Sequence, residues 1–325
     1  MQTLDVVSVC GALMDVVVSV SEAELQTLPL QKGYAHMVGA QEQHEILEKV
    51  NHREFSCELG GSCLNAIRAL ALLGKKTVFA GAVGPDAFGE KIRMRTGEIN
   101  ITAQLSLQPG HATGCCVVLV TPDGERTMVT HLGASSEVGH ADVPAQALQN
   151  TRFFHCSGYA WFAPLQKEAV CQSIAMAKAN GALISIDISD PCVAKSFPQE
   201  MLDLITQNAD IVFANEEEAH LLFPGSPEFA AQSLADLGIL AVIKLGAKGA
   251  LLQRGSERCY ISAETVAVVD TTGAGDMFAA GVLYGLLLDR ELEAAGRMGA
   301  ALAADVIGHY GASLSEQGLA RVRNM

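Results

Sequence analysis

The chain has 325 residues, of which 49% are apolar and 18% charged. This composition is typical of a globular protein with a large core and excludes a disordered chain. The formal net charge is −14, and no run of lysine or arginine interrupts the acidic surface. Because such a surface repels a phosphate backbone, nucleic-acid polymers are excluded as partners.

The nine cysteines are odd in number and show no C-x-x-C spacing. Most lie in apolar runs, where a reduced cysteine acts as a small hydrophobe, so we expect neither a disulfide framework nor a zinc site. The first residues show no basic segment ahead of an apolar stretch, and no apolar run approaches the ~20 residues of a membrane span. We therefore expect a reduced, soluble, cytoplasmic protein without a membrane partner.

Apolar periodicity predicts strands and helices in a nearly regular alternation. A helical pattern opens after Gly60-Gly61, with Ser62 as its cap and Gly74 at its end. Further helices are expected at residues 86–99, 165–179, 199–207, 216–222, 229–237, 274–288 and 292–307. Strands are expected at residues 6–10, 13–20, 77–82, 153–156, 183–187, 211–214, 241–245, 249–253 and 258–261.

This alternation predicts an α/β fold with a central, mainly parallel sheet and helices on both faces. Residues 112–130 form a predicted hairpin around the turn Pro122-Asp123-Gly124. The two β-rich segments, 13–58 and 102–130, are expected to pair into a small β-sheet lid. Residues 1–12, 59–101 and 131–325 would then form the large α/β domain.

The segment VVDTTGAGDMFAAGVLYGLL carries the strongest chemical signal. An apolar run reaches Asp270, glycines follow, and a long helix begins. Glycines let a ligand approach the backbone, and the free N–H groups at a helix start favour a phosphate. Asp276, in the first turn, can accept a proton from an attacking hydroxyl. Considered alone, the same residues fit a simple alternative equally well. The glycines would only shape a turn, and the Asp276 carboxylate would only interact favourably with the helix dipole.

Two other phosphate-binding motifs do not fit. The last position of a G-x-G-x-x-G fingerprint is occupied by Phe278, and the segment lies far from the first strand. No G-x-x-x-x-G-K-[ST] sequence occurs, which excludes a P-loop enzyme.

The segment closely resembles the C-terminal signature of the ribokinase, or pfkB-type, family of carbohydrate and nucleoside kinases. Further motifs resemble those of the family, in the same order: Gly11 with Asp15, GGSCLNAIRALALLG from Gly60, VGPDAFG at 83–89, Asn215-Glu216-Glu217-Glu218, and KLGAKG at 244–249. Each is weak alone, whereas six in order are specific. The resemblance implies a ribokinase-like fold and an ATP-dependent transferase.

The resemblance implies a task for each matching residue. Asp276 would be the base that deprotonates a substrate CH₂OH, and the N–H groups of Gly273, Ala274 and Gly275 would form an anion hole for the γ-phosphate. Preorganised donors suit charge that builds on phosphoryl oxygens. Asp15, Gly61 and Asn65 would hold substrate hydroxyls, although local packing is the plain alternative for Asn65.

On the nucleotide side, the resemblance implies that ATP contacts Asn215, Lys244, Gly246, Gly249 and Gly275. Asn215 and Glu218 would organise Mg²⁺ through water, because Mg²⁺ holds its hydration shell tightly. The alternative is that Glu216, Glu217 and Glu218 simply begin a helix, where the helix dipole favours acidic residues. Many members also bind K⁺, and the matching positions are Asp270, Thr272, Val306, His309, Gly311 and Ser315. Arg126 in the hairpin would reach the phosphates when the lid closes, or is a surface arginine.

Three functions are compatible with this sequence. LQKGYAHMV and PDGERTMVTHLGAS look most like adenosine-kinase-like members, which favours a nucleoside kinase acting on adenosine. A kinase of a free sugar, such as a ketose, hexose or acid sugar, is the alternative, although Ser62 replaces the lysine common in ribokinase proper. A catalytically silent binding protein is disfavoured because the implied catalytic residues are all present. Tyr34, Trp161 and Phe162 are candidates to stack on a base, and the lid can form a homodimer, as in some relatives.

Overall fold

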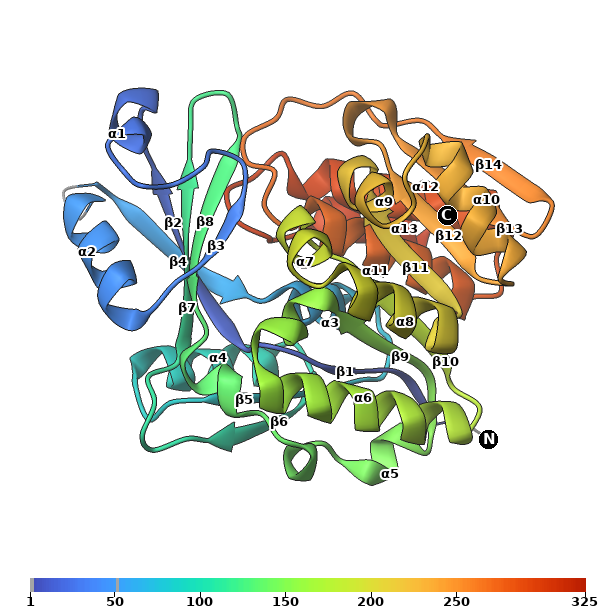
Figure 1. The fold of residues 1–325 in the computed structure, drawn as a ribbon, viewed down its shortest axis with the longest axis horizontal. Coiled ribbons are helices and arrows are strands. Elements are labelled where there is room, and N and C mark those ends of the chain that lie inside the picture. Colours follow the sequence, from blue (N-terminus) through green and yellow to red (C-terminus); the bar gives the residue numbers. More distant parts are fainter. Residues whose placement is uncertain (1–2, 51–52) are drawn as a thin grey trace.

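The computed structural model describes residues 3–50 and 53–325. Its larger sheet has nine strands in the order β14-β13-β12-β11-β10-β9-β1-β5-β6 (Figure 1). The strands are β1 (Leu4–Val9), β5 (Thr77–Val83), β6 (Thr102–Leu107), β9 (Thr151–Ser157), β10 (Leu183–Asp187), β11 (Ile211–Asn215), β12 (Leu240–Lys244), β13 (Ala250–Arg254) and β14 (Glu257–Ile261). The pairs from β6 to β12 are parallel, and β13 and β14 close the sheet with antiparallel pairs.

Helices cover both faces of this sheet because alternate residues of its strands point to opposite sides. In β1, Val6 belongs to one core cluster and Val7 to the other. The first face carries α3 (Ser62–Leu72), α4 (Ala87–Glu98), α11 (Ala274–Leu287), α12 (Leu292–Val306) and α13 (Glu316–Arg323). The second carries α5 (Ala145–Leu148), α6 (Pro164–Ala179), α7 (Pro191–Ser196), α8 (Pro198–Asn208), α9 (Glu216–Leu222) and α10 (Pro227–Asp236).

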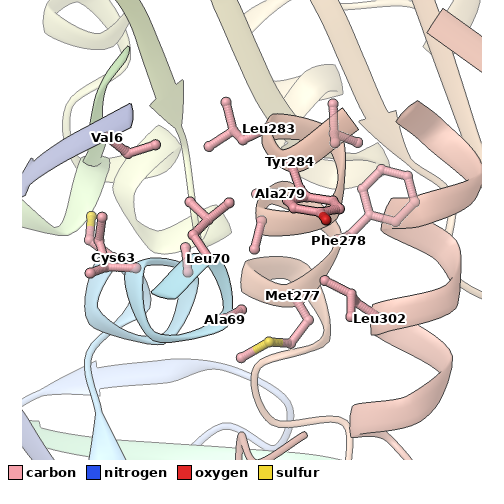
Figure 2. Close-up of a cluster of buried hydrophobic side chains, with 14 of the residues drawn as sticks. Val6, Cys63, Ala69, Leu70, Met277, Phe278, Ala279, Leu283, Tyr284 and Leu302 are labelled. Atoms are coloured by element: carbon pink, nitrogen blue, oxygen red, sulfur yellow. The ribbon is translucent and has the colours of Figure 1, made fainter. Parts of the chain in front are cut away.

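The packing of α3 against α11 fixes the site described below. Both helices are buried for most of their length. Figure 2 shows Leu70 of α3 reaching toward α11, with Leu302 of α12 on the other side of α11. This packing brings Ser62 and Asn65, in the first turn of α3, next to Asp276 in the first turn of α11.

The smaller sheet has the strand order β3-β8-β7-β2-β4. Its strands are β2 (Leu13–Ser19), β3 (Ala35–Met37), β4 (Phe55–Gly60), β7 (Gly114–Val120) and β8 (Arg126–His131). The expected hairpin is confirmed, since β7 and β8 are antiparallel, and the two β-rich segments do share one sheet. We propose that this sheet is the lid.

Two features of the lid differ from the sequence interpretation. Thr102–Leu107 pairs with β5 at the edge of the large sheet, so the second lid segment begins near Gly114 rather than at residue 102. Within residues 13–58, α1 (Glu22–Gln26) and α2 (Ala40–Val50) cover one face of the small sheet (Figure 1). The other face carries Leu13, Cys116 and Met128.

Among the described residues, no helix combines the length and apolar character that a membrane crossing requires. All nine cysteines are free thiols.

Candidate active site

A cavity lies where the small sheet, the start of α11 and the ends of β10 and β12 meet. It is lined by residues from both sheets and from helices α3 and α11, among them Asp15, Asn65, Arg126, Asp187, Lys244 and Asp276. Since parallel strands bring their carboxyl ends to one edge of a sheet, this is the edge where open α/β folds bind ligands. Residues separated by more than 250 positions therefore contribute to one site.

The backbone at the start of α11 offers free donors to the cavity. Gly273 has a φ of +76°, and a Cβ added there would lie 2.5 Å from the Cβ of Ala312, so only glycine fits. The N–H of Ala274 donates to Thr271 O at 3.2 Å. The N–H groups of Gly273 and Gly275 meet no acceptor within residues 3–50 and 53–325. Two of the three expected donors are therefore available to an anion.

Asp276 is held by two side chains from α3. Ser62 Oγ donates to Asp276 Oδ1 at 2.7 Å, and Asn65 Nδ2 donates to Oδ2 at 2.9 Å. Burial raises the pKa of Asp276 to about 6, although the hydrogen bonds from Asn65 and Ser62 oppose the rise. The carboxylate is thus poised to take up a proton near neutral pH.

Ser62 has a role that the sequence interpretation missed. The N-cap of α3 is Gly61, with a φ of +98° and no side-chain cap bond, so Ser62 does not cap the helix as expected. Its hydroxyl instead binds Asp276, 214 positions away. Only the packing of α3 on α11 could show this partner.

Asp15 and Asn65 present unpaired polar atoms to the cavity. Asn65 Oδ1 is buried and accepts no hydrogen bond within the described chain. Asp15 is 5% exposed, and burial raises its pKa to about 7, with Arg68 acting in the opposite direction. Buried polar groups normally find a partner. A ligand hydroxyl can supply it, and Gly61 lies on the same wall.

Asn215 and Glu218 are hydrogen-bonded to each other. Asn215 caps α9, its Oδ1 accepts from Glu218 N, and both Glu218 oxygens accept from Asn215, all at 2.8 Å. Burial raises the pKa of Glu218 to about 8. These two residues therefore form no open oxygen set for a directly bound Mg²⁺ and fit only contact through the ion's water shell.

Lys244, at the end of β12, pairs with Asp187, at the end of β10. Its Nζ lies 3.0 and 3.1 Å from the two carboxylate oxygens, and both residues line the cavity. Asp187 was missed because ISID carries no motif, although a carboxylate ending a parallel strand was an available signal.

The loop after Lys244 carries the other two glycines expected near the nucleotide. Gly246 begins a short 3₁₀ turn, and Gly249 ends it with a φ of +95°. A Cβ at Gly249 would meet Ile261 O at 1.8 Å, which excludes any side chain. Neither glycine is among the residues that line the cavity.

Two of the residues matched to a K⁺ site, Thr272 and Gly311, hydrogen-bond to Asp270. Its Oδ1 accepts from Thr272 N and Oγ1, and its Oδ2 accepts from Gly311 N. The N–H of His309 donates to Val306 O. Ser315 is engaged elsewhere, because it caps α13 and donates to Asp305. The side chains of Asp270 and Ser315 are thus hydrogen-bonded within the chain.

The β7–β8 hairpin contacts Thr271, two residues before Gly273. Arg126 Nη1 donates to Thr271 Oγ1 at 3.1 Å, and Thr271 Oγ1 donates to Gly124 O at 3.3 Å. A second contact joins Tyr34 Oη to Glu217 Oε1 at 3.2 Å, with Lys195 Nζ 2.8 Å from Glu217. The small sheet and the turn before β3 therefore contact the rest of the chain at two places, Thr271 and Glu217.

The three aromatic side chains that were candidates to stack on a base lie outside the cavity. Tyr34 binds Glu217, Phe162 packs edge-on against Phe197, and Trp161 is buried beside Lys167. None of the three lines the cavity. Tyr159, which was not predicted, does line it and donates to Asp190 at 3.2 Å.

Comparison with known proteins gives a consistent result. Residues 34–318 match the model of the pfkB family carbohydrate kinases. A probable sugar kinase from Rhizobium etli is 31% identical, with a TM-score of 0.94 and coverage of 100% of this chain and 99% of that one. Adenosine kinase from Sinorhizobium meliloti is 30% identical, with a TM-score of 0.94 and 99% coverage of both chains. Ribokinase from Haemophilus influenzae is 29% identical over 82% of this chain and 87% of its own length.

Proposed function

Because the chain belongs to the pfkB family of carbohydrate kinases, we propose that it transfers the γ-phosphate of ATP to the primary hydroxyl of a nucleoside, with adenosine as the first candidate. Family membership makes it a phosphotransferase with an alcohol acceptor and implies ATP as co-substrate. The nucleoside and the residue roles are the new elements of the proposal.

One observation carries the chemistry: Asp276 stands at a helix start with free backbone N–H groups, and within the described part of the chain only Ser62 and Asn65 bind its carboxylate. The acceptor hydroxyl replaces one of these donors and gives its proton to Asp276. The N–H groups of Gly273 and Gly275 bind the phosphoryl oxygens on which charge builds.

The acceptor's ring hydroxyls bind Asp15 and Asn65. Asp15 lacks a donor among the described side chains, and Asn65 Oδ1 lacks one as well. A diol supplies two donors in the spacing that a carboxylate and an amide can share. Both a ribose and a free sugar meet this requirement, so the choice rests on the rest of the cavity.

The lid side of the cavity favours a nucleoside. Its lining includes five apolar or weakly polar side chains from the small sheet and its neighbours: Leu13, Met37, Cys116, Met128 and Leu132. A free sugar carries hydroxyls around its ring, whereas a nucleobase offers a flat apolar face that packs on methionine and leucine. The surplus apolar surface therefore suits a base attached to the sugar.

The nucleotide is proposed to lie along the ends of β11 and β12, next to Asn215, Lys244, Gly246 and Gly249. Mg²⁺ would arrive with the phosphates and contact Glu218 and Asn215 through water. When bound, it would neutralise phosphate charge. K⁺ activation through the carbonyls near Asp270 belongs to the same proposal.

A free-sugar kinase is the second candidate, because the polar residues Thr130, Tyr159 and Gln166 also line the cavity. Release of ADP, measured with purified protein, MgATP and a panel of nucleosides, ketoses, hexoses and acid sugars, decides between the two. We expect the highest kcat/KM with adenosine. Turnover with sugars alone contradicts the nucleoside assignment, and ATP binding without turnover on any acceptor supports a silent protein.

The setting of the enzyme is also a proposal. Nine free thiols suit a reducing, cytoplasmic compartment. A homodimer through the lid is compatible with the position of β4 at the edge of the small sheet, where Phe55 is 64% exposed. Sedimentation of the purified protein tests the dimer.

A further inference from the structure

We propose that Lys244 is a second catalytic residue, and that Asp187 positions it: the Lys244 ammonium leaves Asp187 and binds the γ-phosphoryl group as that group is transferred. This inference rests on the proposed kinase function. It gives Lys244 and Asp187 a role in phosphoryl transfer in addition to the ion pair that they form in the structure.

The first support is position. Lys244 Nζ is so close to the start of α11 that a Cβ built on Gly275 would lie 3.2 Å from it. The ammonium therefore stands beside the free N–H of Gly275, where the phosphoryl oxygens are expected. It lines the same cavity as Asp276, and so adds a full positive charge next to the partial charges of the backbone N–H groups.

The second support is how the pair is exposed. The Asp187 side chain is 2% exposed and the Lys244 side chain 15%. The buried member is the carboxylate, and the ammonium is the one that still meets the cavity. A Lys side chain with four rotatable bonds can swing from one oxygen ligand to another, whereas its partner stays fixed.

Asp187 is fixed by a strained turn. Its Oδ1 accepts from Ser189 N at 2.9 Å, and Ser189 adopts a φ of +77°, which non-glycine residues rarely do. Ser189 is in turn bound to Ser157, with 2.7 Å between the hydroxyl oxygens. Backbone strain of this kind is retained mainly where function requires it. Here it holds the carboxylate that aims the lysine.

The charge balance keeps the lysine protonated. Burial alone lowers the pKa of Lys244, but the carboxylates of Asp187 and Glu218 raise it above its ordinary value. Asp276 acts in the same direction. The ammonium is therefore charged throughout the neutral range and is available to an incoming phosphate.

The transfer step balances with these groups. The acceptor oxygen forms a bond to the γ-phosphorus, the bond from that phosphorus to the β–γ bridging oxygen breaks, and ADP departs with the electron pair. The hydroxyl proton goes to Asp276. Lys244 donates an N–H to a γ-phosphoryl oxygen, losing one contact to Asp187, and returns to Asp187 once the product leaves.

A three-variant comparison separates this task from a structural one. Lys244→Met leaves a buried carboxylate unpaired, and should lower both the melting temperature and kcat. Asp187→Leu removes the positioning carboxylate alone. The double variant Lys244→Met/Asp187→Leu removes both charges, so stability should return, as it does when a buried pair is replaced by apolar residues.

The decisive readout is kcat in the double variant. We expect a loss of about 10²-fold or more at saturating ATP, with a smaller change in KM for ATP, because the contact is strongest in the transition state. Recovery of both the melting temperature and kcat overturns the inference. A loss confined to KM also overturns it, since that pattern belongs to ground-state binding.

A second measurement does not depend on turnover. Binding of MgADP with aluminium fluoride, a mimic of the transferring phosphoryl group, should weaken about 10²-fold or more in the double variant, whereas binding of MgADP alone should change little. Equal weakening of both overturns the role of Lys244. Wild-type protein that binds MgADP with aluminium fluoride but phosphorylates no acceptor contradicts the proposed function and leaves this measurement valid.

Discussion

Ser62 Oγ donates a 2.7 Å hydrogen bond to Asp276 Oδ1, and the two residues come from the first turns of different helices. Asn65, one turn further along α3, binds the other oxygen. These bonds favour the charged carboxylate, whereas burial favours the neutral acid, and the balance places the pKa of Asp276 at about 6. The start of α3 therefore tunes the proposed base.

Ser62→Ala should shift the acid limb of the kcat/KM profile to higher pH. Asp276 accepts a proton only when ionised, so kcat/KM rises as pH increases through its pKa. Removing a hydrogen bond to the charged form raises that pKa further. The check is the pH dependence of kcat/KM from pH 5 to 9, with Ser62→Thr, which keeps the hydroxyl, as the matched control. An unmoved acid limb in Ser62→Ala would disprove the tuning role.

Asp276→Asn should lower kcat by about 10²- to 10⁴-fold, the range that a general base contributes. The folded protein should persist, because burying the ionised Asp276 costs stability at neutral pH and the amide removes that charge. Initial rates and thermal unfolding of the same preparation test both parts. Asp203→Asn, an exposed change on α8, is the control and should leave kcat intact. Near-normal turnover in Asp276→Asn would remove Asp276 from the mechanism.

The order of helices and strands was predictable because most elements carry their own signal. The strand Leu4–Val9 and the helix Ala274–Leu287 are mostly apolar, and glycines lie close to where the strand ends and the helix begins. The α2 helix (Ala40–Val50) was missed, although its polar sequence is amphipathic and places Ile46 and Val50 against the small sheet. The edge strand Thr102–Leu107 was assigned to the lid for a related reason: its pairing with β5 is a long-range property.

Site residues could be predicted from the sequence only where they belong to a recognisable motif. Asp276, Asn65 and Asp15, which the resemblance matched to the site, line one cavity, and their roles stay predictions. Asp187 and Tyr159 line it too, but each lies in a stretch with no recognisable spacing. Partner choice was the least predictable property, because Ser62 was expected to cap a helix and instead binds a side chain from the other end of the chain. Local propensity gives no information about such a pair.

Asp15 should make the protein less stable as pH rises from about 4 to about 7. Its pKa rises from the ordinary 3.8 to about 7 on folding, because the carboxyl is buried. Within that window the folded state keeps a proton that the unfolded state loses, so the free energy of unfolding falls with increasing pH. At about 1.4 kcal/mol per pKa unit, the effect is on the order of a few kcal/mol.

Urea unfolding of wild type and Asp15→Asn at pH 4.5 and pH 8 isolates this contribution. The variant should gain stability relative to wild type at pH 8 and little at pH 4.5. Asp203→Asn serves again as the control, with the same difference from wild type at both pH values. A pH-independent difference for Asp15→Asn would show that the carboxyl is ionised in the folded protein.

The Thr271 hydroxyl should couple lid closure to phosphate transfer. It accepts a hydrogen bond from Arg126 and donates one to Gly124 O, so one atom joins the lid hairpin to the turn that precedes the anion hole. Thr271→Val keeps the shape and loses both bonds. An open lid admits water to the γ-phosphate, so ATP hydrolysis without acceptor should rise relative to transfer, as it should when the hairpin is deleted.

The ratio of ADP formed to phosphorylated acceptor measures this coupling directly. We expect a ratio close to one for wild type and a clear increase for Thr271→Val. Thr206→Val on the exposed side of α8 is the matched control, because its hydroxyl donates to the carbonyls of Leu202 and Asp203 in its own helix. If the ratio stays at one in Thr271→Val and in the hairpin deletion, the small sheet does not exclude water, and closure must serve acceptor binding alone.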